Sequence, residues 1–332
     1  MSQLFNALWI EEDAAQHFQR RIIQRSIDDL PAGEVLIEVH WSSLNYKDAL
    51  SATGNKGVTR HYPHTPGIDA AGIIVETQHP DWQVGDPVIV TGHDLGMNTS
   101  GGYGRYVRVP ASWLVRCPEN LSLQTAMLYG TAGLTAAISV YRLRQHAILP
   151  QNGEILVTGA SGGVGSIGVG LLAHLGYRVV AATGKPEAKP LLERLGAHRI
   201  IGREELIDLS PRPLLKARWA GVLDTVGGDI LATALKSVDY AGAVTCCGLV
   251  SAAEFATSVF PFILRGITLI GVESVEFPAD ERAILWTLMA NEWRFPELES
   301  LMTVTDLETL NTVYIDKILH GQVQGRVVVK LA

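Results

Sequence analysis

Residues 154–175 form an apolar strand, a glycine-rich turn and an apolar helix, a succession typical of parallel α/β sheets. The turn is Gly159-Ala160-Ser161-Gly162-Gly163-Val164-Gly165, which fits G-x-G-x-x-G with Ala160 in the first glycine position. In this pattern Gly162 lets the backbone approach a pyrophosphate, and Gly165 lets the helix pack on the strand. The first N–H groups of the helix then face the phosphates. We predict a dinucleotide-binding turn with contacts from Ser161, Gly162, Gly163 and Val164.

From about residue 123, short apolar runs alternate with helical segments. A helix-like stretch covers residues 123–143. Six apolar runs follow, at residues 155–158, 179–183, 199–201, 221–226, 243–247 and 269–272. This alternation predicts a parallel sheet with helices on both faces, and six strands complete a doubly wound Rossmann sheet.

The two ends of the chain have a different pattern. Before about residue 122, short strands are broken by glycine and proline, at residues 35–40, 71–76, 87–91 and 106–109. After residue 275, two helical segments precede a β-rich ending at residues 325–331. We therefore expect a β-rich domain at 1–122, a Rossmann domain at 123–275, and a return segment at 276–332 that completes the first domain.

The end of the second Rossmann strand indicates which nicotinamide cofactor binds. A carboxylate there would bind a ribose 2′-OH and repel a 2′-phosphate. This chain instead has Ala182-Thr183-Gly184-Lys185, without a carboxylate. Thr183 can donate a hydrogen bond and Lys185 can pair with the phosphate, while Arg203 follows the third strand. We predict NADPH rather than NADH, although both cations have an alternative as ordinary solvated charges.

Composition and charge exclude several classes of protein. Of 332 residues, 47% are hydrophobic, which provides a core and excludes disorder. A net charge of -7 without a dense basic run argues against a nucleic-acid partner. The 3 cysteines suit neither a disulfide framework nor a four-cysteine zinc site, and fit a cytoplasmic protein. No signal peptide starts the sequence, and the one long apolar window is the glycine-rich helix, so we expect no membrane partner.

Several strings outside the turn share one resemblance. They are His40-Trp41-Ser42-Ser43-Leu44-Asn45-Tyr46-Lys47-Asp48-Ala49-Leu50, Pro66-Gly67-Ile68-Asp69, Gly130-Thr131-Ala132-Gly133, Asp224-Thr225-Val226-Gly227, Pro261-Phe262-Ile263-Leu264-Arg265 and Gln324-Gly325-Arg326. Together with the turn, they resemble the medium-chain dehydrogenase/reductase superfamily. Within it, they are similar to the zinc-free quinone oxidoreductase branch of the acrylyl-CoA reductase type. The resemblance covers nearly the whole chain.

This resemblance implies a GroES-like substrate domain split around the Rossmann domain. Zinc alcohol dehydrogenases of the superfamily carry a cysteine in the first-domain segment and Gly-His-Glu where this chain has Gly67-Ile68-Asp69. Neither of those ligands is present here, and the chain lacks the four-cysteine cluster of a structural zinc lobe. His61 and His64 lie close together without partners at ligand spacing, so we expect loop histidines and no metal site.

The function implied is reduction of a conjugated double bond, because such an acceptor is activated without a metal. NADPH would reduce a short enoyl-CoA such as acrylyl-CoA, with Tyr46 as the proton donor. Asn45 would orient the nicotinamide or the thioester carbonyl, and Thr131 would line the cleft. Tyr46 has an alternative role, which is to stack on the nicotinamide. Lys47 and Asp48 are expected to be an exposed or domain-locking pair without a chemical role.

Two other functions remain open: an NADPH:quinone oxidoreductase, and an NADPH-binding redox sensor without turnover. Cations such as Arg105 or Arg265 would distinguish a CoA ester, because its phosphates need a basic rim. The resemblance also implies cofactor contacts at Leu249, Ile263, Ser274 and Arg326, and a homodimer paired through residues 269–272. Cys246 and Cys247 are expected to be structural thiols.

Overall fold

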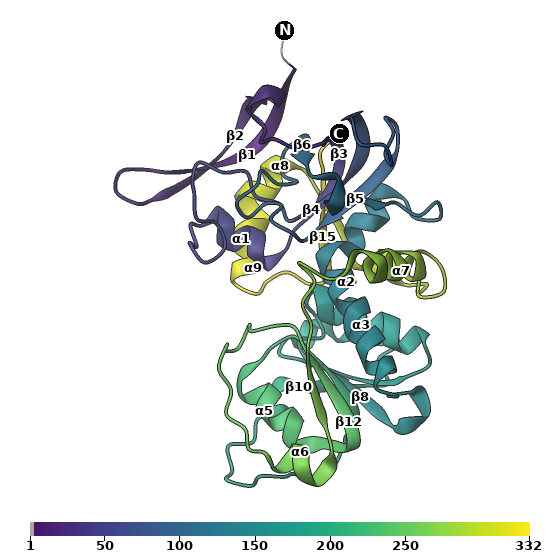
Figure 1. Cartoon of the computed structure of the whole chain (residues 1–332). Coiled ribbons are helices and arrows are strands. Elements are labelled where there is room, and N and C mark those ends of the chain that lie inside the picture. Colours follow the sequence, from purple (N-terminus) through teal and green to yellow (C-terminus); the bar gives the residue numbers. More distant parts are fainter. Residues whose placement is uncertain (1–2) are drawn as a thin grey trace. The chain divides into compact units, whose positions relative to one another are not determined.

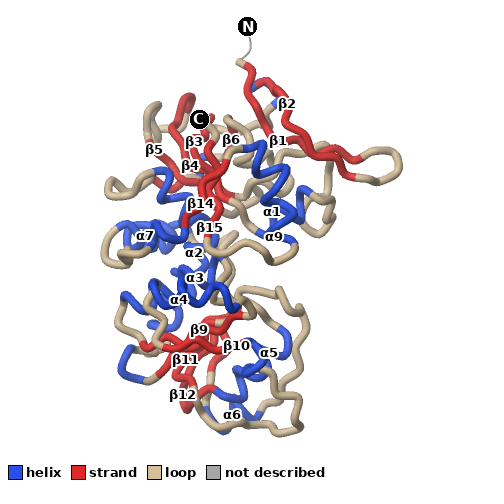
Figure 2. Tube along the Cα trace, turned by 180° about the vertical axis from the view of Figure 1, so that it is seen from behind, coloured by secondary structure: helices blue, strands red, loops and turns tan. Residues whose placement is uncertain are grey.

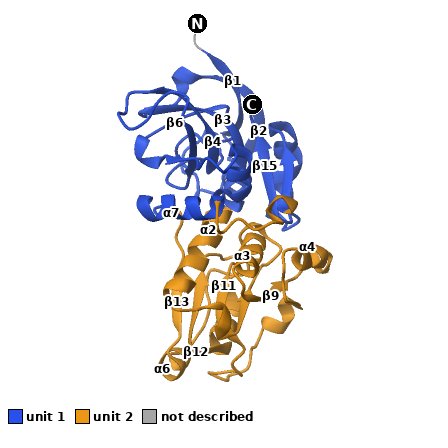
Figure 3. Cartoon of the chain, turned by 90° about the vertical axis from the view of Figure 1, so that its right-hand side faces the viewer, with its two compact units in different colours: residues 1–131, 275–290, 301–332 blue, residues 132–274, 291–300 orange. Residues whose placement is uncertain are grey.

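The computed structural model describes residues 3–332, which divide into two compact units (Figure 3). Unit 1 contains the chain up to Thr131 together with Val275–Ala290 and Leu301–Ala332, and unit 2 contains Ala132–Ser274 and Asn291–Ser300. The predicted boundary between the first and second segments lies at 122/123, where a helix starts. The boundary between the two compact units lies inside that helix, after Thr131. Residues 291–300, predicted as part of the return segment, group with unit 2.

Unit 2 is built on a six-stranded parallel sheet with the order β10-β9-β8-β11-β12-β13 (Figure 1). Its strands are β8 (Glu154–Val157), β9 (Arg178–Thr183), β10 (Arg199–Gly202), β11 (Trp219–Asp224), β12 (Val238–Cys246) and β13 (Thr268–Gly271). Counted along the chain, this is the 3-2-1-4-5-6 order of a Rossmann sheet. The predicted doubly wound sheet of six strands is confirmed.

Helices cover both faces of this sheet (Figure 2). They are α3 (Gly163–His174), α4 (Lys189–Arg194), α5 (Gly228–Ser237) and α6 (Phe260–Arg265). Figure 2 shows α3 and α4 on one side, and α5 and α6 on the other. The core against α5 contains Val222, Leu235 and Val244, all with 0% exposure. Because the strands are buried on both faces, they appear in the sequence as continuous apolar runs.

The predicted helix at 123–143 is α2 (Leu123–Gln145), and it is broken at Gly130. Gly130 has φ 51° and ψ -156°, a combination that is outside the helical region and almost restricted to glycine. The break lies one residue before the end of the first stretch of unit 1. It turns the backbone of Thr131 toward the interior of unit 1, as described below.

Unit 1 contains a seven-stranded sheet and a separate two-stranded hairpin. The hairpin strands β1 (Leu4–Glu12) and β2 (Phe18–Ser26) pair antiparallel. The larger sheet has the order β14-β15-β3-β4-β5-β7, with β6 also paired to β3. Its strands are β3 (Val35–Ser43), β4 (Asp69–Thr77), β5 (Pro87–Thr91), β6 (Tyr106–Val109), β7 (Val115–Arg116), β14 (Met302–Thr305) and β15 (Arg326–Lys330).

The C-terminal strand β15 pairs antiparallel with β3 and parallel with β14. Val327, Val328 and Val329 are buried in this strand. Helices α1 (Tyr46–Ala52), α7 (Ala279–Ala290), α8 (Leu307–Thr309) and α9 (Ile315–Leu319) complete unit 1, and a π-helical turn, Leu310–Tyr314, joins α8 to α9. Within residues 3–332, no helix combines the length and the apolarity that crossing a bilayer requires.

Candidate functional site

The glycine-rich turn between β8 and α3 is too crowded for side chains at two positions. A Cβ atom on Gly165 would lie 2.3 Å from the Gly159 carbonyl oxygen and 2.8 Å from Ala160 Cα. A Cβ atom on Gly159, where φ is +58°, would lie 2.3 Å from Thr225 Oγ1. Gly162 precedes α3 and has no side chain to cap it, so the N–H groups of the first helical turn stay available to a phosphate.

The ends of β9 and β10 bring the predicted 2′-phosphate residues together. Gly202, at the end of β10, pairs with Thr183, at the end of β9. A Cβ atom on Gly184 would lie 2.9 Å from Arg203 Cδ and Nε, so the Arg203 side chain lies directly against Gly184. Because glycine has no side chain, position 184 leaves room for the Arg203 guanidinium.

The side chains of Ser161 and Thr183 also meet at this edge of the sheet. Their hydroxyl oxygens are 3.0 Å apart, and the Lys185 N–H donates to Thr183 Oγ1 at 3.1 Å. Burial lowers the pKa of Lys185 from its ordinary value. An anion beside the ammonium group would raise this pKa. Hydroxyl groups, two cations and a helix N-terminus at one sheet edge fit a dinucleotide with a 2′-phosphate.

Unit 1 contains a buried polar cluster centred on Asp69, which we term the Asp69 cluster. Its members come from β3, β4, β15, the start of α1 and the break in α2: Ser43, Asn45, Asp69, Thr131 and Arg326. The Asp69 carboxylate accepts hydrogen bonds from Ser43 Oγ at 2.5 Å and Asn45 Nδ2 at 2.7 Å. It also accepts from Thr131 Oγ1 at 2.5 Å and from the Thr131 N–H at 3.0 Å.

Arg326 supplies the positive charge of the Asp69 cluster. Its Nη2 lies 3.8 Å from Asp69 Oδ2, and the two residues are 3% and 0% exposed. The guanidinium donates to the carbonyls of Leu44 and Leu128 and to Ser43 Oγ. Removal from water lowers the pKa of Arg326, while Asp69 acts to raise it. Since most of its donors bind protein groups, Arg326 is placed in the interior of unit 1 rather than at an open surface.

The break at Gly130 is needed to make room for the Asp69 cluster. A Cβ atom there would lie 2.4 Å from Asp69 Oδ2, 2.6 Å from Ser43 Oγ and 2.8 Å from Arg326 Nη2. The positive φ of Gly130 also disfavours any larger residue. The sequence string Gly130-Thr131 thus corresponds to a close approach of α2 to the buried charges.

Asn45 was expected to orient a ligand, but its amide is already engaged. Nδ2 donates to Asp69, and Oδ1 accepts from Arg326 Nη1 at 3.1 Å. The residue is 8% exposed. This geometry gives Asn45 the role of holding Asp69 and Arg326 in place. A direct contact with the nicotinamide or the thioester stays a prediction that this structure does not favour.

Asp48 differs from its expected place, because it is neither exposed nor part of a surface pair. It is 0% exposed and caps the N-terminus of α1. Its carboxylate accepts from the N–H groups of Asn45 and Ile68, each at 2.8 Å, and from Tyr103 Oη at 3.0 Å. The spacing Asn45-x-x-Asp48 is that of a capping box, a signal in the sequence that predicts this contact.

Tyr46 is the first residue of α1 and is accessible. Its side chain is 44% exposed, directly after the buried Asn45. Thr131 is partly buried, and its hydroxyl donates to Asp69. Both predicted residues therefore lie in unit 1: Thr131 belongs to the Asp69 cluster, and Tyr46 directly follows its member Asn45.

Three further predicted cofactor contacts lie in unit 2. Leu249 and Ile263 are exposed, at 65% and 68%. Ser274 is partly buried and accepts a hydrogen bond from Thr135 at 3.2 Å. Leu249 follows β12 and Ser274 follows β13, so both are near carboxyl ends of parallel strands, where ligands bind in such sheets.

The two cations suggested for a CoA rim have other partners. Arg105 pairs with Glu38 at 2.8 Å on the surface of unit 1. Arg265 donates to the carbonyls of Lys236 and Val238, which connect the end of α5 to the start of β12. These contacts place Arg265 at the amino end of β12, away from the carboxyl edge, so it does not provide the expected rim.

The adjacent cysteines have structural contacts. Cys247 Sγ lies 3.3 Å from the carbonyl oxygen of the buried Asp224. Burial raises the pKa of Cys247 to about 12. A thiol of this kind is a poor nucleophile at neutral pH. These contacts agree with a structural thiol at Cys247, and the same expectation for Cys246 stays a prediction.

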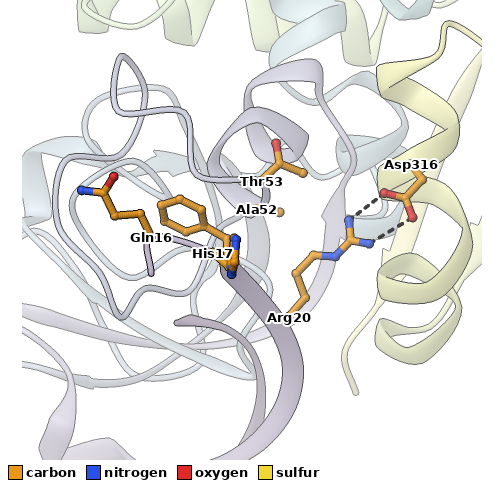
Figure 4. Close-up of a pocket in the computed structure, with 7 residues that line it drawn as sticks. Gln16, His17, Arg20, Ala52, Thr53 and Asp316 are labelled. Atoms are coloured by element: carbon orange, nitrogen blue, oxygen red, sulfur yellow. Dashed lines mark hydrogen bonds and ion pairs between the residues drawn. The ribbon is translucent and has the colours of Figure 1, made fainter. Parts of the chain in front are cut away.

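A separate open cavity of about 430 Å³ lies in unit 1 (Figure 4). It is lined by Gln16, His17, Phe18, Arg20, Ala52, Thr53 and Asp316. Arg20 and Asp316 form a bidentate ion pair with distances of 2.9 and 3.0 Å, so their charges already satisfy each other.

Among residues 3–332, no three His, Cys, Asp or Glu side chains are grouped as metal ligands.

Comparison with known proteins gives consistent matches along the chain. Residues 31–119 match the family described as alcohol dehydrogenase GroES-like domain, and residues 163–291 match zinc-binding dehydrogenase. Acrylyl-CoA reductase AcuI of Ruegeria pomeroyi is 42% identical over 98% of this chain and 99% of its own length.

Two solved structures have the same fold over nearly their whole length. The yhdH oxidoreductase of Salmonella enterica, in complex with NADP, has a TM-score of 0.95 and 42% identity, covering 98% of this chain and 100% of that one. The Bacillus subtilis protein yhfP, with NAD bound, has a TM-score of 0.96 and 44% identity, covering 99% of this chain and 100% of that one.

The fold and the family matches define a two-domain dehydrogenase with a GroES-like domain and a Rossmann domain. The chain belongs to the medium-chain dehydrogenase/reductase superfamily, in its zinc-free group, and it is an oxidoreductase. The resemblance stated from the sequence and the predicted fold class are both confirmed.

Proposed function

We propose that this oxidoreductase uses NADPH to reduce the conjugated double bond of a short enoyl-CoA, such as acrylyl-CoA to propionyl-CoA. The main support is the similarity to an acrylyl-CoA reductase over 98% of the chain. The cofactor is NADPH, in line with the NADP-bound Salmonella structure. One similar structure contains NAD, so the choice of NADPH over NADH is argued from the residues of this chain. Lys185 and Arg203, with Thr183, provide the groups that a 2′-phosphate needs.

The cofactor supplies the hydride when it is bound. The turn at Gly159–Gly165 and the start of α3 would hold its diphosphate, and Ser161, Thr183, Lys185 and Arg203 would hold the adenosine end. Leu249 and Ser274 are proposed as further contacts at the carboxyl edge of the sheet. The predicted contact of Ile263 is not carried over, because Ile263 lies in α6 with Arg265, at the amino end of β12. Thr131, whose hydroxyl donates to Asp69, is proposed as a further residue of the cofactor site.

The substrate needs a proton as well as a hydride. Hydride addition at the β-carbon leaves an enolate of the thioester. The reduction is complete only after the α-carbon is protonated. Tyr46 donates that proton from its phenol in our proposal, and water then restores the phenol. Tyr46 is suited to this role because its side chain is exposed, whereas the neighbouring Asn45 is buried. Asn45, Asp69 and Arg326 keep the backbone before Tyr46 in place.

Replacement of Tyr46 by phenylalanine tests the proton donor. We expect kcat for acrylyl-CoA to fall about 100-fold, the usual contribution of a general acid, with NADPH affinity unchanged. The absorbance change on NADPH oxidation gives kcat, and a titration with NADPH in the absence of substrate gives the affinity. Tyr240→Phe is the matched control, since Tyr240 is exposed in unit 2 at the surface of β12. A Tyr46→Phe enzyme as fast as the control would leave Tyr46 as a packing residue only.

The same assay separates the competing functions. Chelator-treated protein is compared on acrylyl-CoA, crotonyl-CoA and a simple benzoquinone. Turnover on the quinone alone would replace our proposal with an NADPH:quinone oxidoreductase. Tight NADPH binding without turnover on any acceptor would indicate a redox sensor.

We also propose a homodimer formed through β13. This strand is at the edge of the six-stranded sheet, where its backbone groups are available for pairing. Apolar side chains of the preceding segment are exposed: Val259, Phe260, Ile263 and Leu264. We expect the mass of a dimer in light scattering and a monomer after Ile270→Lys. A wild-type monomer at all concentrations would contradict the dimer.

A further inference from the structure

Tyr103 places a hydroxyl group between two acceptors in the interior of unit 1. Its Oη lies 3.0 Å from Asp48 Oδ2 and 3.2 Å from the Ser43 carbonyl oxygen. Tyr103, Asp48 and Ser43 are all 0% exposed. The single hydroxyl proton can point to only one acceptor at a time. The group therefore has two hydrogen-bonded arrangements without any movement of heavy atoms.

The two arrangements correspond to two protonation states of Asp48. When Asp48 is ionised, Tyr103 donates to its Oδ2, together with the Asn45 N–H. When Asp48 is protonated, its own O–H donates to Tyr103 Oη, and Tyr103 donates to the Ser43 carbonyl. Each proton has an acceptor in both states, so the buried acid tolerates either charge.

Asp48 also connects α1 to the segment before β4. Its Oδ2 accepts from the Asn45 N–H and its Oδ1 from the Ile68 N–H, each at 2.8 Å. Tyr46 directly follows Asn45 and begins α1. An ionised carboxylate accepts these hydrogen bonds more strongly than a neutral carboxyl group. The protonation state of Asp48 thus changes how firmly the backbone before Tyr46 is held.

We propose that Asp48 and Tyr103 are positioning residues for the reaction, acting as a hydrogen-bond switch that holds the first turn of α1, and with it Tyr46, when Asp48 is ionised. The effect on turnover rests on the proposed function. The hold on Asn45 and Ile68 is independent of the substrate.

The charges around Asp48 support a switch near neutral pH. The titratable groups that face it are Asp69 from β4, Arg326 from β15 and Tyr103, while Lys47 on α1 is exposed. Burial first, and then the charge of Asp69, raise the pKa of Asp48 to about 7. The hydrogen bond from Tyr103 acts in the opposite direction.

The sign of the pH dependence follows from this shift. Because the folded pKa is above the ordinary value of 3.8, Asp48 binds a proton more tightly in the folded protein. Its contribution to stability is fully present below about pH 4 and is lost as pH rises to about 7. The hold on α1 concerns a local opening in which Asp48 stays buried and loses only the N–H groups of Asn45 and Ile68. Those hydrogen bonds lower the pKa of Asp48, so their loss raises it, and this local opening becomes harder as pH rises through about 7.

The kinetic test compares Tyr103→Phe with Tyr62→Phe. Tyr62 is the matched control, because its hydroxyl donates to the Ser51 carbonyl at the other end of α1. We expect Tyr103→Phe to lower kcat for acrylyl-CoA about tenfold with little change in KM, and to move the acidic limb of the pH–rate profile to higher pH. The control should leave the limb in place. Identical limbs in the two variants would overturn the proposal.

The second measurement is amide hydrogen exchange of Asn45 and Ile68 in the full-length protein. Protection of both amides, corrected for the intrinsic rate, should increase as pH rises through about 7, and it should not change with pH in Asp48→Asn. Constant protection in the wild type would overturn the switch. If the wild type does not reduce an enoyl-CoA, the proposed function fails, while exchange still decides the switch. The wild-type exchange measurement also decides it if neither variant folds.

Discussion

Asp69→Asn is expected to lower the free energy of unfolding by about 3–5 kcal/mol, since it leaves a buried arginine without its counter-charge. Arg326 is 3% exposed and has Asp69 as its charged partner, 3.8 Å away. An asparagine at position 69 also presents an NH₂ group to neighbours that are all donors toward Asp69: Ser43, Asn45 and Thr131. Loss of the charge and of several hydrogen bonds at once explains the large effect.

The control is Glu76→Gln, a carboxylate replacement on the same strand. Glu76 is exposed and pairs with Arg108 at 3.1 Å, a surface contact expected to contribute about 0–1 kcal/mol. Both variants and the wild type are unfolded with urea and followed by tryptophan fluorescence and circular dichroism. A loss for Asp69→Asn that is no larger than for Glu76→Gln would show that the Asp69 cluster does not stabilise unit 1.

Removal of both proposed 2′-phosphate cations has the largest expected effect on binding. In Lys185→Ala/Arg203→Ala, we expect the Kd for NADPH to rise about 100-fold, equal to about 2.7 kcal/mol. The Kd for NADH should change by less than about threefold, because NADH has no 2′-phosphate and the diphosphate site at α3 is intact. Isothermal titration with each cofactor measures both values without any substrate.

Lys189→Ala serves as the matched control for a lost positive charge. Lys189 begins α4 and pairs with Glu193 at 3.8 Å, so it has a surface partner of its own. Affinity for both cofactors should remain at the wild-type value. Equal losses of NADPH and NADH binding in the double variant would contradict the assignment of Lys185 and Arg203 to the 2′-phosphate.

The Rossmann half of the fold was predictable from sequence because its signals are local. Buried parallel strands appear as apolar runs, and the run at 179–183 corresponds to β9 within one residue. The start of β12 at Val238 was missed, since Asp239, Tyr240 and Ala241 interrupt the apolar run there. The β1–β2 hairpin was not predicted either, because β2 carries charged residues along a half-exposed strand.

The candidate site was predictable only where it depends on neighbouring residues. The glycine turn and the end of β9 are continuous segments, so Gly162, Gly163 and Lys185 could be proposed from spacing, and their cofactor contacts stay predictions. The Asp69 cluster joins residues from five separate elements, and only the fold brings Arg326 to Asp69. Asp48 was expected to form an exposed or domain-locking pair with Lys47, whereas its capping-box spacing predicted the contact with the start of α1. The cytoplasmic location rests on cysteine usage and stays a prediction.

In the proposed reaction, hydride from NADPH is added to the β-carbon of an enoyl-CoA. The most direct test uses chelator-treated protein, crotonyl-CoA and NADPH deuterated at the nicotinamide C4, with the product examined by mass spectrometry and NMR. We predict butyryl-CoA with deuterium at the β-carbon and a solvent-derived proton at the α-carbon. Product without deuterium at the β-carbon, or no reduction of crotonyl-CoA and acrylyl-CoA at all, would contradict the account.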